Sequence, residues 1–355
     1  MAFPKIAIVL INYRTAQLTL DCLASLEPEV KQHPETHVVV IDSASGDGSA
    51  DVLEQHRSSR GWREWMSLVR LDENRGFSAG NNAGMAFAEE LGHFDSLLLL
   101  NSDTMVRPGA LGALSEVLER EPSVGVVGPS LEWPGGQMQA SCFRKISPAS
   151  EFVTAAKTGA ISRLFQRGEV AIPNPPYHDA RGQHAVAPLP DEIEWISFAC
   201  VLIRTEVIES IGRMDEGFFM YFEDVDYCRR ARSAGWQIAY APEARVVHLR
   251  GGRTPDAFAA EERRRRPAYY YRSRARYLAR YYGPTGPWRA NLCWLLGRGI
   301  SLAREVVGNK PPHTASCEVA DIWKGSLCGF RRSHKITRGS CKTMGQAASL
   351  PRHPC

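Results

Sequence analysis

Two clusters of polar side chains follow apolar stretches and could carry out chemistry. The first is Asn101-Ser102-Asp103, directly after the four leucines at 97–100. A short, wholly apolar run is typical of a strand buried on both faces, which would place the cluster at the carboxyl end of that strand. Ligands bind at this edge of an open α/β sheet, and a carboxylate beside an amide oxygen suits Mg²⁺ or Mn²⁺ holding a diphosphate. Asn, Ser and Asp are also ordinary turn formers, so the motif alone leaves both interpretations open.

The second cluster, Glu223-Asp224-Val225-Asp226, follows five apolar or aromatic residues at 218–222. If a helix begins there, Glu223 and Asp226 would share one face while Asp224 points elsewhere. The helix dipole also favours acidic residues in a first turn, so capping is the simpler interpretation of this motif alone. His248 ends a strand-like stretch at 244–248. A lone histidine is more often structural, but beside a metal-type carboxylate it is a candidate ligand.

The elements that would position these residues alternate between strands and helices. Strands are expected at 6–11, 37–41, 68–71, 97–100, 124–127, 195–204 and 244–248. Helices are expected from the apolar stripes Leu18, Cys22 and Leu26; Ala83, Phe87 and Leu91; and Leu111, Leu114 and Leu118. The alternation implies βαβ units in a mainly parallel sheet. Between Leu131 and Asp191, proline, glycine and scattered aromatics predict long loops that shape a substrate pocket.

The C-terminal third has a different composition. Four consecutive arginines at 263–266 precede the stretch 269–282, in which Tyr and Arg alternate on an expected helix. Such a stretch is usually a solvated face, but it could equally contact a diphosphate or an anionic membrane surface. The apolar region 288–307 is interrupted by four charged residues, so no transmembrane segment is expected. From residue 310 the periodicity is weak, and about the last 20 residues are expected to be disordered.

Composition and short motifs argue against several classes of protein. The 355 residues are 44% hydrophobic and 23% charged, which is typical of a globular chain, and a net charge of +4 does not indicate nucleic-acid binding. The nine cysteines are scattered without a Cys-x-x-Cys pair. No signal peptide is evident, so we expect a cytoplasmic protein. The sequence contains neither the Gly-x-Gly-x-x-Gly of dinucleotide-binding folds nor a P-loop.

Six short motifs occur in a fixed order along the chain. They lie at 9–13 (Val-Leu-Ile-Asn-Tyr), 42–49 (Asp-Ser-Ala-Ser-Gly-Asp-Gly-Ser), 74–82 (Asn-Arg-Gly-Phe-Ser-Ala-Gly-Asn-Asn), 100–103 (Leu-Asn-Ser-Asp), 215–226 (Asp-Glu-Gly-Phe-Phe-Met-Tyr-Phe-Glu-Asp-Val-Asp) and 242–248 (Pro-Glu-Ala-Arg-Val-Val-His). With these motifs the chain resembles glycosyltransferase family 2, and within it the rhamnosyltransferase-like members that build bacterial polysaccharides. Each motif is weak alone, but together they are highly specific.

The resemblance implies a GT-A fold, which is an α/β, Rossmann-like nucleotide-sugar-binding domain with a mainly parallel central sheet. The implied glycosyltransferase domain is 1–255, with a nucleotide-sugar half at 1–104 and an acceptor half at 105–255. A helical basic and aromatic extension follows at 256–309, and a partly disordered tail at 310–355. The residues with implied roles are Asn12, Asp42, Asn74, Asn81 and Asn101 for the donor, Asp103 and His248 for a Mg²⁺ or Mn²⁺ ion, Asp224 as the base, and Trp195, Phe198 and Glu223 on the acceptor side.

Three positions depart from the family pattern. Ser43 stands where asparagine is usual, Asn101 replaces the first acidic residue of the metal-binding Asp-x-Asp, and Phe198 stands where glycine is usual. A phenyl ring at 198 could narrow the pocket and change the choice of acceptor. The Gln-x-x-Arg-Trp motif of processive relatives is absent, which indicates that one or a few sugars are added.

The expected reaction is displacement of a nucleoside diphosphate from an anomeric carbon by an acceptor hydroxyl, which favours a metal ion on one side and a base on the other. A single acceptor-side carboxylate indicates one displacement with inversion. Asp224 is preferred as the base, because Asp226 is expected to bind helix-terminal amides and Glu223 has a longer side chain.

The expected donor is dTDP-rhamnose, with a UDP-hexose as the second choice, and the expected acceptor is a glycan or a lipid-linked glycan at the inner membrane surface. One alternative is a catalytically silent nucleotide-sugar-binding scaffold. Another is a nucleotidyltransferase, which would need a glycine-rich phosphate loop after the first strand, and residues 12–15 are not one. The sequence does not indicate the oligomeric state.

Overall fold

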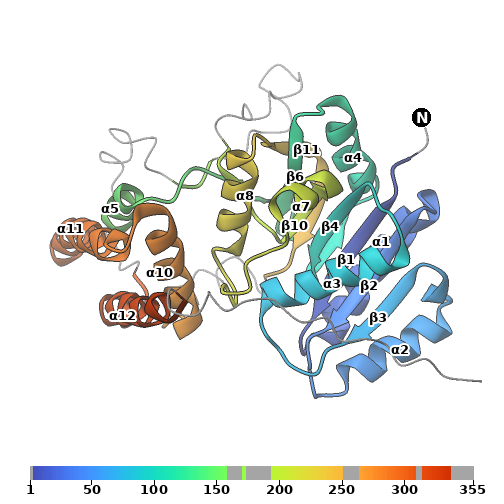
Figure 1. The fold of residues 1–355 in the computed structure, drawn as a ribbon, viewed down its shortest axis with the longest axis horizontal. Coiled ribbons are helices and arrows are strands. Elements are labelled where there is room, and N and C mark those ends of the chain that lie inside the picture. Colours follow the sequence, from blue (N-terminus) through green and yellow to red (C-terminus); the bar gives the residue numbers. More distant parts are fainter. Residues whose placement is uncertain (1–2, 158–169, 173–192, 251–263, 309–313, 337–355) are drawn as a thin grey trace, which may run out of the picture.

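The computed structural model describes residues 3–157, 170–172, 193–250, 264–308 and 314–336 (Figure 1). Its strands are β1 (Ile6–Asn12), β2 (Thr36–Asp42), β3 (Met66–Arg70), β4 (Ser96–Asn101), β5 (Thr104–Val106), β6 (Val124–Glu132), β7 (Met138–Gln139), β8 (Cys142–Phe143), β9 (Trp195–Ile196), β10 (Cys200–Arg204) and β11 (Gln237–His248). Its α-helices are α1 (Ala16–Gln32), α2 (Ser49–Ser59), α3 (Phe77–Leu91), α4 (Ala110–Arg120), α5 (Pro148–Ala156), α7 (Thr205–Ile211), α8 (Glu223–Ser233), α10 (Ala268–Tyr282), α11 (Gly286–Val306) and α12 (Glu318–Ile336).

The main sheet has the strand order β3-β2-β1-β4-β10-β6-β11-β5, with β7 paired to β6. The first four strands in this order are parallel, and β6 is parallel to β11. The exceptions are β10, which runs antiparallel to both of its neighbours, β5, which runs antiparallel to β11, and β7, which runs antiparallel to β6. The predicted α/β architecture with a mainly parallel sheet is therefore confirmed.

The strands at the centre of the sheet are apolar on both faces because helices cover both faces (Figure 1). On one face, Ile8 and Leu10 of β1 pack into a core with residues of α1 and α4. On the other, Ala7 and Val9 pack into a second core with residues of α3 and α8. The two cores hold the strands rigidly, so the residues that follow the strand ends are held in fixed positions.

The helix α3 packs on the sheet through Met85 and several small residues, and of the predicted stripe at 83, 87 and 91, Phe87 packs against the same core while partly exposed. Leu91 is 46% exposed, whereas Gly80 and Gly84 are on the buried face. A Cβ atom on Gly84 would lie 2.3 Å from Val9 Cγ1, so only glycine allows this close approach. The predicted stripe describes only part of the buried face, because the tightest helix contact here is made by residues without large side chains.

Two further predictions need correction. The expected strand at 195–204 is two strands, β9 and β10, separated by residues 197–199. The expected long loops at 131–191 contain β7, β8 and α5, and α5 begins with a capping box between Ser147 and Ser150. The rest of that region, 158–169 and 173–192, lies outside the described residues.

The helices α5, α10, α11 and α12 pack against one another beside the sheet (Figure 1). Ala155, Tyr271, Trp294 and Ile322, one from each helix, form a small shared core. Within the tail expected from residue 310, α12 forms regular structure as far as Ile336, and the stretch 337–355, for which disorder is expected, lies outside the described residues. Within the described residues, no helix is both long and apolar enough to span a membrane.

Candidate active site

Parallel pairing places three of the predicted donor residues next to one another at one edge of the sheet. Asn12 pairs in register with Asp42 on β2, and Ile11 pairs with Asn101 on β4. The Asn101 backbone N–H also donates to the Ala199 carbonyl at 2.9 Å, which ties this edge to the segment before β10. The polar residues therefore line the carboxyl ends of β2, β1 and β4, the edge at which such sheets bind ligands.

Asn12 is fully buried, and its amide atoms have partners within the protein. Its Nδ2 donates to Asp42 Oδ2 (2.6 Å) and Ser45 Oγ (3.2 Å), and its Oδ1 accepts from the hydroxyls of Thr19 (2.8 Å) and Thr15 (3.2 Å). Ser45 donates to Asp42 through its backbone N–H (3.1 Å) and its hydroxyl (2.6 Å). Asn12 and Ser45 thus fix the Asp42 carboxylate. The sequence signal for Ser45 was its place in the 42–49 motif, and Thr19 stood out only as a polar residue on a helix expected to be amphipathic.

The two predicted metal ligands, Asp103 and His248, lie together. The antiparallel pairing of β5 and β11 sets His248 opposite Thr104, and the Leu249 backbone N–H donates to the Asp103 carbonyl at 2.8 Å. His248 Nε2 lies 3.5 Å from Asp103 Oδ1. Gln139 Nε2 donates to the His248 carbonyl at 2.7 Å, which helps to fix the backbone of the histidine. Residues 145 positions apart in the chain are therefore brought side by side by one strand pair.

The donor atoms in this corner fit a divalent ion that is only partly coordinated by protein. Asn101 Oδ1 and His248 Nδ1 are buried and lack a hydrogen-bond partner in the part of the chain that the structure describes. Among those residues there is no group of three or more His, Cys, Asp or Glu side chains that could hold a metal ion. Mg²⁺ is commonly held by one or two protein ligands together with substrate phosphates and water, so a two-ligand corner is compatible with it.

A glycine turn joins the predicted donor side to the acceptor side. Asn74 Oδ1 accepts from the Gly76 backbone N–H at 2.9 Å, and the Phe77 N–H donates to the Phe219 carbonyl at 2.7 Å. Gly76 has a φ of +95°, and a Cβ atom there would lie 2.2 Å from Phe219 O. Both the backbone conformation and the close approach therefore require glycine. Arg75 Nη2 adds an ion pair to Glu216 at 2.7 Å.

Asn82, which the sequence did not single out, strengthens this junction. Its Nδ2 donates to Met214 O (2.9 Å) and Glu216 Oε1 (3.1 Å), and its Oδ1 accepts from Met214 N (2.9 Å). The predicted donor residue Asn81 instead donates to Phe77 O within its own helix at 3.0 Å. Of the two adjacent asparagines, Asn82 is the one that fixes the segment at 214–216.

The acidic turn at the start of α8 combines backbone strain with buried charge. Tyr221 and Phe222 both have a φ of +68°, an uncommon conformation for bulky residues, and they lead directly into Glu223 and Asp224. Glu223 is buried, and its Oε2 has no hydrogen-bond partner among the described residues. Asp224 is partly exposed and accepts from the Val225 N–H at 2.8 Å. Strained turns of this kind are concentrated at functional sites.

Burial, followed by the nearby Asp224 carboxylate, raises the pKa of Glu223 well above its ordinary value. Burial also raises the pKa of Asp224 to about 7, although hydrogen bonds from the backbone N–H groups of Val225 and of Asp224 itself act in the opposite direction. Two neighbouring carboxyl groups, one buried and one partly exposed, are not both ionised easily. The pair therefore retains a proton to higher pH than an isolated carboxyl group would.

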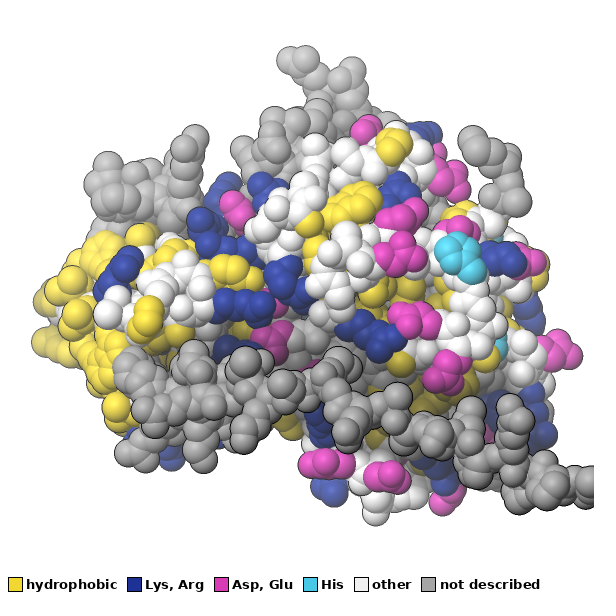
Figure 2. All heavy atoms as spheres, viewed as in Figure 1, with side chains coloured by type: hydrophobic (Ala, Val, Ile, Leu, Met, Phe, Trp, Pro, Cys, Tyr) yellow, Lys and Arg dark blue, Asp and Glu magenta, His cyan; other side chains and the backbone are white. Residues whose placement is uncertain are grey.

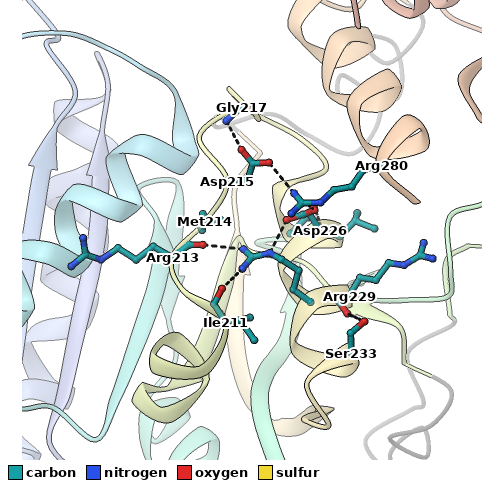
Figure 3. A network of polar contacts seen from close by, with 12 residues as sticks. Ile211, Arg213, Met214, Asp215, Gly217, Asp226, Arg229, Ser233 and Arg280 are labelled. Carbon is teal, nitrogen blue, oxygen red and sulfur yellow. Dashed lines mark hydrogen bonds and ion pairs between the residues drawn. The ribbon is translucent and has the colours of Figure 1, made fainter. Parts of the chain in front are cut away.

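Asp226 holds α8 against α10 (Figure 3). Its carboxylate accepts from Arg230 Nε (3.0 Å) and from the Tyr281 hydroxyl (2.8 Å), and it pairs with Arg280 Nη1 at 3.0 Å. The expectation that Asp226 binds helix-terminal amides was wrong, because these side chains occupy its oxygens. Arg280 also pairs with Asp215 at 2.9 Å, so it lies between the two carboxylates.

The same network reaches the segment that precedes the acidic turn. Asp215 Oδ1 accepts from the Gly217 N–H at 2.8 Å, and Asp215 also pairs with Arg276 at 2.8 Å. Arg230 donates to the carbonyls of Ile211 (2.7 Å) and Arg213 (3.0 Å) (Figure 3). Charge-assisted contacts from α8 and α10 thus fix both ends of the segment 211–217.

The two predicted aromatic residues of the acceptor side have different surroundings. Trp195 stacks on Phe143 with ring centroids 4.0 Å apart, and its Nε1 donates to Arg144 O at 3.0 Å. Phe198 is buried and packs edge-on against Tyr227 with centroids 5.9 Å apart. Because Tyr227 is three residues after Asp224, the ring of Phe198 is positioned to support α8 from the side of β4 and β10.

Comparisons with known proteins agree with this architecture. Residues 4–270 match the family described as glycosyltransferase like family 2. The chain is 27% identical over 280 residues to an N-acetylglucosaminyl-diphospho-decaprenol L-rhamnosyltransferase of Mycobacterium tuberculosis, covering 75% of this chain and 81% of that protein. It is 22% identical to the dTDP-rhamnosyl transferase RfbF of Shigella flexneri, covering 69% of each.

A solved structure shows the same fold. A mannosyltransferase from Pyrobaculum calidifontis, solved in complex with GDP-mannose and Mn²⁺, superposes with a TM-score of 0.52 at 14% identity, over 94% of this chain and 83% of that one. The family match extends from before β1 into α10 and so includes both the donor edge and the acidic turn. The chain therefore belongs to the glycosyltransferase like family 2 and has the GT-A fold.

Proposed function

We propose that this glycosyltransferase is a metal-dependent, inverting enzyme that transfers rhamnose from dTDP-rhamnose to a hydroxyl of a glycan or lipid-linked glycan. The observation that carries the proposal is the corner formed by Asp103 and His248, 3.5 Å apart, at the same sheet edge as Asn12, Asp42 and Asn101. Hard oxygen and imidazole ligands at this edge suit a divalent ion that contacts a diphosphate.

On the donor side, the fixed Asp42 carboxylate would bind the ribose or base, and the turn at 74–77 would close over the nucleotide. Asp103 and His248 would hold Mg²⁺ or Mn²⁺. When bound, such an ion neutralises negative charge that develops on the leaving diphosphate. A mannosyltransferase of similar fold was solved with GDP-mannose and Mn²⁺, which supports this proposal.

On the acceptor side, Asp224 would be the general base. The acceptor oxygen attacks the anomeric carbon from the face opposite the diphosphate, and its proton passes to Asp224. The bond from the anomeric carbon to the diphosphate oxygen breaks, and its electron pair leaves with the nucleoside diphosphate. Because a single displacement occurs, the anomeric configuration inverts. The pKa of Asp224, raised to about 7 by burial, makes it a stronger base than an ordinary aspartate while leaving it largely ionised above neutral pH.

The rhamnosyl donor is supported by the names of two relatives, one a decaprenol-linked L-rhamnosyltransferase and the other a dTDP-rhamnosyl transferase. The first of these names also supports a lipid-linked acceptor, and with it a place at the inner surface of the membrane. A UDP-hexose donor remains the second candidate. We also propose that the donor half is 1–104 and the acceptor half is 105–255, with the helical extension after them.

The test is an assay of nucleoside diphosphate release across a panel of nucleotide sugars with Mg²⁺ or Mn²⁺. We expect dTDP-rhamnose to be turned over fastest, and activity to disappear in excess chelator. NMR of the product should show the anomeric configuration opposite to that of the donor. Binding of nucleotide without release of diphosphate from any donor would favour the silent scaffold instead, and unchanged activity in chelator would exclude the metal.

A further inference from the structure

The helix α11 buries mainly small side chains and exposes several large apolar ones. Its buried face consists mainly of small residues, including Ala290, Gly297 and Ser301, and a Cβ atom on Gly297 would lie 2.3 Å from Phe152 O of α5. The close contact with α5 therefore uses little apolar side-chain area. Of the large apolar side chains of α11, Trp294 is buried and Leu295 is partly buried against the small shared core, whereas most of the others face solvent.

Six large apolar side chains are exposed along α11 and at its C-terminal end. Their exposed fractions are 55% for Leu292, 67% for Leu296, 36% for Ile300, 49% for Leu302, 80% for Val306 and 80% for Val307. Leu292, Leu296 and Ile300 are spaced by four residues, so they form one stripe on the helix surface. In the space-filling view, hydrophobic side chains gather at the end of the molecule where Figure 1 places α11 (Figure 2). A continuous apolar patch of this kind marks an interaction surface.

Positive charge accompanies the apolar stripe. Arg289 is exposed near the start of α11, and the only acidic residue of the helix, Glu305, pairs with Arg298 at 2.7 Å. The helix also carries the partly exposed Arg304, and Lys324 of the neighbouring α12 is exposed. An amphipathic helix that combines an apolar stripe with an excess of arginine is typical of proteins that lie on anionic membranes.

Composition and charge argue against two other occupants of the stripe, namely the C-terminal residues of the chain and a second copy of the chain. Residues 337–355 contain only Met344 and Leu350 as large aliphatic side chains, too few to cover six exposed ones. A second copy of the chain, docked through the same face, would bring the exposed arginines of two α11 helices together, and like charges at an interface are unfavourable. An anionic lipid surface complements both the apolar stripe and the arginines of α11.

We propose that α11 lies in the plane of an anionic lipid bilayer, with the stripe of Leu292, Leu296 and Ile300 inserted among the acyl chains. This inference rests on the lipid-linked acceptor of the proposed function and identifies the surface that reaches it. It also replaces the expected membrane contact of the arginines at 263–266 and in α10. Of these, Arg265 and Arg266 pair with Asp321 and Glu318 of α12, and three arginines of α10 (Arg274, Arg276 and Arg280) pair with carboxylates within the protein.

The orientation has a consequence for the active site. Trp294 of α11 and Tyr271 of α10 share one small core, and α10 carries Arg280, which pairs with Asp215 and Asp226. A bilayer-bound α11 would therefore hold the acidic turn at a fixed position relative to the membrane. A lipid-linked acceptor would meet Asp224 without leaving the bilayer.

The test is flotation of the full-length protein with phospholipid vesicles, without any sugar nucleotide. We expect the wild-type protein to float with phosphatidylcholine vesicles that contain about one third phosphatidylglycerol, and to bind pure phosphatidylcholine at least about tenfold more weakly. The double variant Leu292→Ser and Leu296→Ser should bind the anionic vesicles at least about tenfold more weakly than wild type. The control Leu91→Ser, which changes an exposed leucine at the end of α3, should float like wild type.

Several results would overturn the inference. Equal flotation of the double variant and the wild type would show that α11 is not the contact, and failure of the wild type to float would show that there is none. A wild-type dimer that the double variant converts into a monomer, without vesicle binding, would identify the stripe as a subunit interface. Diphosphate release with a water-soluble acceptor, measured separately, tests the proposed function. A protein that floats but releases no diphosphate would contradict that function and leave the membrane contact established.

Discussion

The donor edge and the acceptor side of this protein are stabilised in opposite ways. At the donor edge, Asn12 and Asp42 satisfy each other's hydrogen bonds at the ends of strands whose register is set by a rigid core. On the acceptor side, Glu223 and Asp224 begin α8 directly after two residues with positive φ. Long-range ion pairs from α10 hold Asp215 in the segment before them. Non-glycine residues with positive φ occur on both sides, at Arg14 and Ala44 beside the donor edge and at Tyr221 and Phe222 before the acidic turn. The difference lies in the carboxyl groups, because Asp42 is hydrogen-bonded by Asn12 and Ser45, whereas Glu223 Oε2 has no hydrogen-bond partner among the described residues, a feature typical of functional sites.

The largest effect on turnover is expected from a substitution at the donor edge. Asp103→Ala removes one of the two proposed metal ligands, so turnover should fall at least about 10³-fold, while the melting temperature stays near that of wild type because Asp103 is partly exposed. Steady-state rates and thermal unfolding measure the two quantities. Asp51→Ala, a control at an exposed carboxylate of α2, should keep full activity. Near-normal turnover of Asp103→Ala would rule out the metal site.

The next effect concerns the proposed base. Asp224→Asn keeps size and polarity, so it should lower kcat by about 10² to 10⁴, or about 3 to 5.5 kcal/mol of barrier, and leave the KM for the donor almost unchanged. Glu223→Gln is the matched control, because glutamine and glutamate are nearly isosteric, and it should keep most of its activity. If Glu223→Gln is inactive and Asp224→Asn keeps more than about a third of the wild-type rate, the assignment of the base is reversed.

The raised pKa of Asp224 on the acceptor side should also be visible in the pH dependence of activity and stability. Because burial raises the pKa of Asp224 to about 7, kcat should fall about tenfold per pH unit below that value. The folded-state pKa lies above the unfolded value, so ionisation favours the unfolded state and this contribution to stability is lost as pH rises through about 7. The stability of Asp224→Asn relative to wild type should therefore rise from about pH 4 to about pH 7 and level off above pH 7, as measured by melting temperature. A difference that is independent of pH would mean that Asp224 is not perturbed.

A smaller effect is expected from the ion pairs that hold the acceptor side. Arg280→Ala removes the cation shared by Asp215 and Asp226, so kcat should fall about tenfold through misplacement of the acidic turn, with little change in the donor KM. The loss of stability should be only about 1 kcal/mol because Arg280 is 41% exposed. Arg272→Ala, which changes an exposed arginine of the same helix, is the control for both measurements. A parallel loss of donor affinity would show that the network also serves the donor edge.

The smallest expected effect tests the base specificity of the donor edge. Thymidine diphosphate with Mg²⁺ should raise the melting temperature more than uridine diphosphate at the same concentration, since a ligand stabilises in proportion to the logarithm of its concentration over its Kd. A clearly larger shift with uridine diphosphate would favour a UDP-hexose as the donor. The comparison needs no acceptor and so reports on the donor edge alone.

The sequence predicted the strand ends better than the helices. Buried parallel strands produce uninterrupted apolar runs such as that at 97–100, and the residue after each run must lie at the sheet edge, which is why Asp42, Asn101 and Asp103 were found. The stripe predicted for α3 was only partly right, because Phe87 packs against the core but Leu91 is exposed, and Gly80 and Gly84 make the closest contacts with the sheet. Hydrophobic periodicity shows where large apolar side chains lie. It does not show where small residues allow a helix and a strand to approach each other closely.

By itself, the sequence determined the family, the α/β class and the residues that follow each strand, because these depend on local patterns and on the order of motifs. Only the tertiary structure decided that His248 meets Asp103, that Asn82 and not Asn81 ties α3 to the segment at 214–216, and that Arg280 rather than a helix terminus neutralises Asp226. It also decided that the apolar stripe of α11 faces outward. These outcomes depend on which distant segments share a surface, and no local pattern of residues records that.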